Sequence, residues 1–174
     1  VELVAGFDLL LSPDTGVMHL AAHLGVPVEA FFLSSAWCFE TGPYGKGHRI
    51  WQAMPVSSLD CIPCTETRDC PFETQCLAPF STPEFLARLR GREDIAVSGI
   101  AGMETGFDEL GVVCRPVLDR EKDVFSQSRA AMRALITEWL GIAPACDRNV
   151  QGSAQTFFKE RDWALPSLKS MTEL

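Results

Sequence analysis

The sequence predicts an α/β fold that carries a ligand site at the end of a buried strand, and three neighbouring features indicate it. Phe7–Ser12 is a continuous apolar run, too short for a helix of its own and typical of a strand covered on both faces. Pro13 ends this run, and an apolar helical pattern follows within a few residues. A strand, a sharp turn and an opening helix form the unit from which open α/β sheets are assembled.

The helix that follows the turn is expected over Val17–Leu24. Thr15 is a residue type favoured at the N-cap, and Gly25 and Pro27 stop the helix. The amides of its first turn have no partner within the helix, and the helix dipole favours negative charge at that end. The amino end of this helix is therefore predicted to bind an anion.

The residues at the turn have the chemistry of a phosphate or phospho-sugar site. Gly16 lets the backbone approach a ligand, and His19, one turn into the helix, can donate a hydrogen bond to a phosphate oxygen. Asp14, at the mouth of the turn, can hold a sugar hydroxyl. The residues alone leave a second interpretation open, an ordinary strand-to-helix turn with a capping threonine and a histidine that faces the core.

Four segments of the chain resemble glycosyltransferase family 9, the heptosyltransferases, in the order in which that family shows them. The likeness covers about residues 1–90. A strand expected at Val28–Leu33 separates the first two segments. The segments are Asp14-Thr15-Gly16-x-x-His19-Leu20-Ala21-Ala22 with Leu24-Gly25-Val26-Pro27, the glycine-rich loop Thr41–His48, Cys61-Ile62-Pro63-Cys64, and the helix start Ser81-Thr82-Pro83-Glu84-Phe85-Leu86.

This resemblance implies the C-terminal, Rossmann-like domain of a GT-B glycosyltransferase, with a cysteine-rich excursion. In such an enzyme this domain binds the nucleotide-sugar donor, and the transfer requires no cofactor. The likeness assigns donor-phosphate binding to Thr15, Gly16 and His19, and contact with the transferred sugar or the phosphates to Asp14. Asp14 and His19 are therefore the catalytic candidates.

The glycine-rich loop supplies three further candidate donor-binding residues, Gly42, Tyr44 and Gly45. Tyr44 can stack on an adenine or close over the donor, although a tyrosine in a loop is as often a packing residue. The glycines make the loop a candidate lid.

The implied donor is an ADP-heptose-like sugar, and the implied acceptor is a lipopolysaccharide core or a related glycan, held by an N-terminal domain that this chain lacks. A fragment is expected, since the chain begins at Val1, within a few residues of a strand that needs neighbours on both sides. We expect the isolated chain to catalyse no transfer. The alternatives are another GT-B or epimerase-type enzyme acting on a different nucleotide sugar, and a non-enzymatic interaction module stapled by a metal.

Composition narrows the class of protein. The 174 residues are 47% hydrophobic with a mean hydropathy of +0.08, as in soluble globular domains. A formal net charge of −8 argues against a nucleic-acid partner, which requires clustered basic residues. No segment has the pattern of a signal peptide or the length to span a bilayer. A cytoplasmic location is expected, with at most a peripheral association with the inner membrane.

Four of the seven cysteines form a cluster, Cys61-x2-Cys64-x5-Cys70-x5-Cys76. The spacing fits a tetrahedral shell of four thiolates around a structural zinc or iron ion. Two disulfides in an oxidising compartment, or four reduced thiols, are the alternatives. An ion held by four thiolates would have no open position for catalysis.

Three segments are predicted along the chain: a donor-binding part at 1–90, an α/β continuation at 91–142 and a C-terminal tail at 143–174. The continuation is expected to alternate strands, a turn and one long amphipathic helix. These elements are a strand at Ile95–Ser98, a glycine-bearing turn at Gly99–Gly106, a strand at Gly111–Val117 and a helix at Asp123–Gly141.

Overall fold

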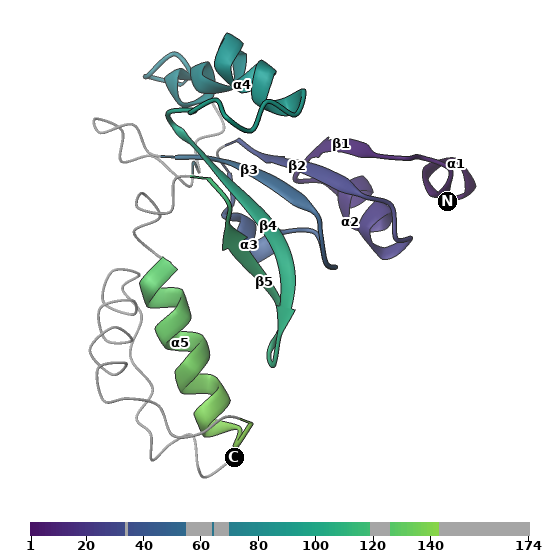
Figure 1. The fold of residues 1–174 in the computed structure, drawn as a ribbon, viewed down its shortest axis with the longest axis vertical. Coiled ribbons are helices and arrows are strands. Elements are labelled where there is room, and N and C mark those ends of the chain that lie inside the picture. The colour runs from purple at the N-terminus through teal and green to yellow at the C-terminus, as the bar shows by residue number, and fades with distance from the viewer. Residues whose placement is uncertain (34, 55–63, 65–69, 119–125, 143–174) are drawn as a thin grey trace. The chain divides into compact units, whose positions relative to one another are not determined.

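The structure is a computed structural model that describes residues 1–33, 35–54, 64, 70–118 and 126–142 (Figure 1). The chain divides into two compact units, Val1–Arg120 and Glu121–Leu174, and each is considered by itself. The first unit contains a five-stranded sheet and the helical elements around it. In chain order the elements are α1 (Glu2–Ala5), β1 (Leu10–Pro13), α2 (Gly16–His23), β2 (Val28–Phe32), α3 (Cys38–Thr41), β3 (Arg49–Ala53), the 3-10 helix η1 (Gln75–Ser81), α4 (Pro83–Leu89), β4 (Ile100–Asp108) and β5 (Gly111–Pro116).

The sheet is mixed, with the strands in the order β1-β2-β3-β4-β5. The first three strands are parallel, and β4 and β5 are antiparallel to their neighbours. The predicted α/β fold is therefore confirmed, and the sheet is consistent with a Rossmann-like domain. The carboxyl ends of β1, β2 and β3 lie at one edge, where open α/β sheets bind their ligands.

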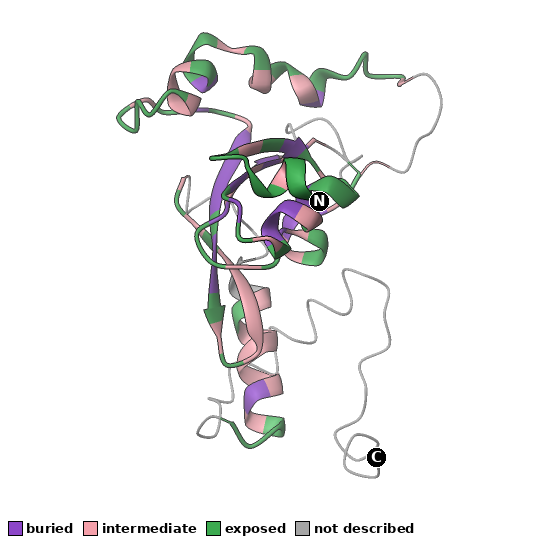
Figure 2. Ribbon diagram, turned by 90° about the vertical axis from the view of Figure 1, so that its right-hand side faces the viewer, coloured by how far each residue is buried: buried purple, intermediate pink, exposed green. Residues whose placement is uncertain are grey.

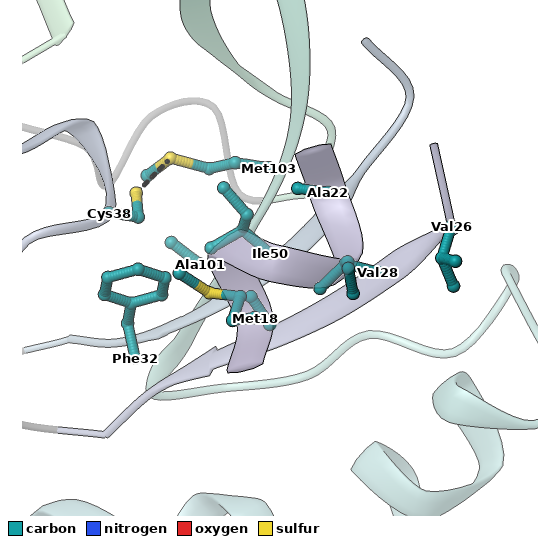
Figure 3. Close-up of a cluster of buried hydrophobic side chains, with 11 residues drawn as sticks. Met18, Ala22, Val26, Val28, Phe32, Cys38, Ile50, Ala101 and Met103 are labelled. Carbon is teal, nitrogen blue, oxygen red and sulfur yellow. Dashed lines mark hydrogen bonds between the residues drawn. The ribbon is translucent and has the colours of Figure 1, made fainter. Parts of the chain in front are cut away.

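One face of the sheet is covered by α2 and α3 (Figure 1). Side chains of these helices meet every second residue of β2, β3 and β4, as the period of a strand requires. Figure 3 shows how closely this cluster packs. Its buried members are Met18, Ala21, Ala22, Val26, Val28, Ala30, Phe32, Cys38, Ile50, Ala101 and Met103.

The opposite face carries an aromatic cluster beneath η1 and α4. Phe85, at the centre of this cluster, has its ring centroid 5.3 Å from that of Trp51 and 5.2 Å from that of Phe80, both edge to face. Trp51 fits because its cross-strand partner is Gly102, which has no side chain. The predicted helix start at Pro83 is confirmed, since the Thr82 hydroxyl accepts the amide of Phe85.

A charged residue, Glu29, is the second residue of β2, where an apolar one would suit a strand covered on both faces. Glu29 is the cross-strand partner of Arg49, and their charged groups lie 3.6 Å apart. The indole N–H of Trp51 also approaches the Glu29 carboxylate, at 3.5 Å. The aromatic face of the sheet thus accepts a carboxylate because a cation and a ring donor lie beside it.

The first strand differs from the prediction. It begins at Leu10 rather than Phe7, and among the described residues it pairs with β2 alone. Ser12 is its one buried residue, whereas the Leu11 side chain is 58% exposed. The leucine run predicts a strand covered on both faces, but one face of this strand is open. Figure 2 shows many of the buried residues in the sheet, while α1 has none.

The region after residue 90 was predicted wrongly in part. Ile95–Ser98 forms no strand, and the segment read as a turn, Gly99–Gly106, lies almost wholly within β4, the longest strand described. The glycines that suggested a turn make room for neighbouring side chains: an added Cβ at Gly106 would lie 3.1 Å from Arg115. The strand predicted at Gly111–Val117 is confirmed as β5.

In the second unit, the predicted long helix is confirmed over the described residues as α5 (Ser126–Trp139). Gly141, with a φ of 67°, follows its end as the predicted stop, and the amide of Ile142 bonds back to the Thr137 carbonyl. The predicted tail at 143–174 lies outside the described residues. Within the part of the chain that is described, no helix is both long and apolar enough to cross a bilayer.

Candidate functional site

The turn between β1 and α2 places Asp14 and Thr15 at the carboxyl edge of the sheet. Thr15 occupies the N-cap position of α2 with extended backbone angles, φ −150° and ψ 163°. Its hydroxyl does not cap the helix, because it lies 3.1 Å from the Ser12 hydroxyl instead. The N-cap position was therefore predicted correctly, but the side-chain cap was not. Because the Thr15 hydroxyl does not accept from the first amides of α2, these amides can donate to another acceptor, such as a ligand.

Three side chains from separate segments converge beside this helix end. The Thr41 hydroxyl, at the last residue of α3, donates a hydrogen bond of 2.7 Å to Oδ2 of Asp14. Nε2 of His19 lies 3.8 Å from Oδ1 of the same carboxylate. The His19 side chain is 47% exposed and that of Asp14 is 23% exposed, so both are accessible to a ligand.

Thr41 was not among the residues predicted for the site. It lies 27 positions after Asp14, and their contact exists because α3 returns to the carboxyl edge after β2. Only the topology brings the two together. In the sequence, the one feature that pointed to Thr41 was its position at the start of the glycine-rich loop.

A pocket of about 190 Å³ opens at the carboxyl ends of β1 and β2. Asp14 forms part of its wall, so the pocket adjoins the amino end of α2. Residues from the ends of β1 and β2 and from the segment after β2 line it. The lining residues are Pro13, Asp14, Phe31, Phe32, Leu33, Ser35 and Ala36.

Two glycines of the glycine-rich loop lie where neighbouring atoms leave no room for a side chain. A Cβ at Gly42 would collide with the carbonyl oxygen of Cys38, and one at Gly45 would collide with the imidazole of His48. Tyr44 is 66% exposed, and its ring meets that of Phe107 edge to face at 5.7 Å between centroids. A donor-binding role for Gly42, Tyr44 and Gly45 stays a prediction.

His48 ends the loop as a buried residue, 5% exposed. Burial lowers the pKa of its imidazole below 6.5, and a hydrogen bond with the Tyr44 backbone partly offsets this. Its backbone is tied to β4, because its amide donates to the Thr105 hydroxyl at 3.0 Å and its carbonyl accepts from the Thr105 amide at 2.9 Å. The loop is thus fastened to the sheet at its far end.

The predicted metal site lies partly outside the described residues, since Cys61 is among those not described. Cys64 and Cys70 are half-buried, and Cys76 is buried at η1. Among the described residues, no group of three or more potential ligands is assembled. Four thiols at this spacing still have the donor chemistry for zinc or iron, and the site stays a prediction.

A family model matches the amino-terminal part of the chain. Residues 1–70 match the family model of glycosyltransferase family 9 (heptosyltransferase). This confirms the resemblance drawn from the sequence over that segment, which contains β1–β3, α2, α3 and the Asp14–His19 turn. No curated protein and no solved structure matches the chain. The family implies a glycosyltransferase of the heptosyltransferase type, with a nucleotide-sugar donor and a glycan acceptor in general terms.

Proposed function

We propose that the Asp14–His19 turn holds the diphosphate of a nucleotide-sugar donor, and that the donor is an ADP-heptose-like sugar. One observation carries the proposal. Asp14, His19 and Thr41 meet at the amino end of α2, within the segment that matches the heptosyltransferase family. Backbone amides at a helix start supply donors and a favourable dipole for a phosphate.

The proposed chemistry follows the charge that develops in sugar transfer. The bond between the anomeric carbon and the diphosphate breaks as an acceptor hydroxyl attacks, and negative charge grows on the leaving phosphate. The first amides of α2 and the His19 imidazole would stabilise that charge from fixed positions. Asp14, kept in place by the Thr41 hydroxyl, would accept a hydrogen bond from a sugar hydroxyl in the adjoining pocket.

The acceptor belongs to the proposal as well. We propose a lipopolysaccharide core or a related glycan, bound by residues other than those described, in a cytoplasmic enzyme associated at most peripherally with the membrane. The general base that deprotonates the acceptor is not assigned to this chain. A turnover assay with the chain alone is therefore expected to show no sugar transfer, and transfer would contradict the proposed division of roles. The transfer itself would use no metal, and an ion at Cys61, Cys64, Cys70 and Cys76 would be structural.

The test is titration calorimetry of the purified chain with ADP. His19→Ala is expected to weaken binding about tenfold, because it removes one charge-assisted hydrogen bond to a phosphate. His23→Ala is the matched control: it removes an imidazole from the same helix at an exposed position in the last turn, and affinity should not change. Equal affinities in all three proteins would contradict the assignment of the phosphates to this turn. Competition with UDP and GDP tests the base, and elemental analysis of the sample tests the cysteine site.

A further inference from the structure

Gln52 is a polar side chain with no exposed surface, in the middle of the sheet. It stands on β3, on the face covered by α2 and α3, two residues after Ile50 of the buried cluster. A buried carboxamide is costly unless its oxygen and its nitrogen both find partners. The identity of these partners therefore indicates what the residue does.

The partners of Gln52 all belong to the end of its own strand or to the connection between β2 and α3. Oε1 accepts a hydrogen bond of 2.9 Å from the amide of Cys38, the first residue of α3. Nε2 faces the carbonyl oxygens of Phe32 and Ala36, each at 3.4 Å, and that of Ala53 at 3.3 Å. The Gln52 side chain on β3 thus bonds to the end of β2 and to the start of α3, the two ends of the β2–α3 connection.

This connection builds part of the candidate site. Phe32 and Ala36 line the pocket beside Asp14. The helix α3 has only four residues, and the Trp37 side chain at its N-cap position makes no capping hydrogen bond. The Gln52 oxygen accepts the first amide of α3 instead, from the face of the sheet that this helix covers. Thr41, which bonds Asp14, is the last residue of the same short helix.

We propose that Gln52 is a positioning residue of the donor site, which fixes the β2–α3 connection and through it the Thr41 hydroxyl against Asp14. This rests on the proposed function, since the site it positions is the donor site. Only a carboxamide of this length both accepts from an amide and donates to carbonyls in one place. A leucine or methionine would fill the volume and remove the acceptor of the Cys38 amide.

The first test compares ADP affinity and stability in two buried variants. Gln52→Leu is expected to weaken ADP binding about tenfold at a temperature where the protein is folded, because misplacing a single polar contact costs about that factor. Val28→Ala is the control, since Val28 is buried on the same face at the amino end of β2, away from the site. It should lose stability to urea and retain wild-type affinity within about twofold. Wild-type affinity in Gln52→Leu, or an equal loss in Val28→Ala, would overturn the proposal. Should the leucine variant fail to fold, Gln52→Asn, which withdraws the carboxamide by one methylene, replaces it with the same expectation.

A second measurement needs no ligand and separates this proposal from the proposed function. If wild-type protein binds no ADP, the proposed function fails, and the positioning role is decided by a double-mutant cycle in urea unfolding. Thr41→Val should cost stability in the wild type, but clearly less in the Gln52→Asn background, because the Thr41 hydroxyl is then no longer held against Asp14. Strict additivity of the two substitutions would refute the positioning role.

Discussion

His48 makes the stability of the protein depend on pH in a way that one substitution should remove. Burial lowers the pKa of its imidazole in the folded protein, whereas in the unfolded chain it titrates near its ordinary value of 6.5. Below about pH 6.5 the unfolded chain therefore binds a proton that the folded protein does not. The stabilisation is complete above pH 6.5 and is lost as the pH falls from there toward the lowered pKa.

The size of the pH effect on the free energy of unfolding is set by the single proton that His48 binds. While His48 is charged only in the unfolded chain, the free energy of unfolding falls by at most about 1.4 kcal/mol for each pH unit. Among the described residues, Nδ1 of His48 has no hydrogen-bond partner and the residue is 5% exposed, so burial disfavours the charged imidazole. Protonation would place a charge in this buried site and turn the unpartnered Nδ1 into a donor without an acceptor.

The assay is urea unfolding followed by tryptophan fluorescence, at half-unit steps from pH 8 to pH 5.5. The wild type should lose stability below about pH 6.5, and His48→Gln should lose markedly less over the same interval, whatever its stability at pH 8. His23→Gln, at an exposed position on α2, is the control and should follow the wild-type curve. If His48→Gln keeps the wild-type dependence on pH, burial of this imidazole does not limit stability and the reasoning is refuted.

Two further predictions concern packing on the aromatic face. Phe85→Ala should lower the free energy of unfolding by about 3–5 kcal/mol, whereas Leu86→Ala, at the exposed neighbouring position, should cost less than about 1 kcal/mol; equal costs in urea unfolding would contradict the assigned core. Gly102→Ala should cost about 1–3 kcal/mol, because the added Cβ would lie 2.8 Å from Cβ of Leu118 and 3.1 Å from the ring of Trp51. Gly106→Ala, on the same face of β4, meets only the flexible end of an arginine and should be the milder change in the same assay.

The elements around the candidate site could be predicted from local sequence because their signals are local. The apolar run, Pro13 and the stop at Gly25 located β1 and α2 to within three residues. The strand expected at Val28–Leu33 agrees with β2 to one residue. The exposure of β1 could not be predicted, since a leucine run reads the same whether a strand has one neighbour or two.

The strand β4 could not be predicted because its glycines are explained by contacts far along the chain. Gly102 faces Trp51, and Gly106 faces Arg115 on β5. Two glycines within five residues predict a turn when only the local sequence is considered. The same limit applies to the site: the hydrogen bond from Thr41 to Asp14 and the four contacts of Gln52 follow from topology. By contrast, Asp14 and His19 were identified from their own short motif, and the structure places them beside each other.

The long segment between β3 and β4 leaves the sheet and returns to it at the same point. Ala53 is the cross-strand partner of Ile100, and directly beyond this pair the amide of Met54 bonds to the carbonyl of Gly99 at 3.0 Å. The strands β3 and β4 are therefore paired as in a β-hairpin, and residues 55–98 are the segment that connects them. The entropic cost of closing a loop rises only slowly with its length. Such a segment can therefore change in length without disturbing the two strands that it connects. The cysteine cluster lies entirely within this loop, so a cross-link there would shorten the loop while the hairpin keeps its own register.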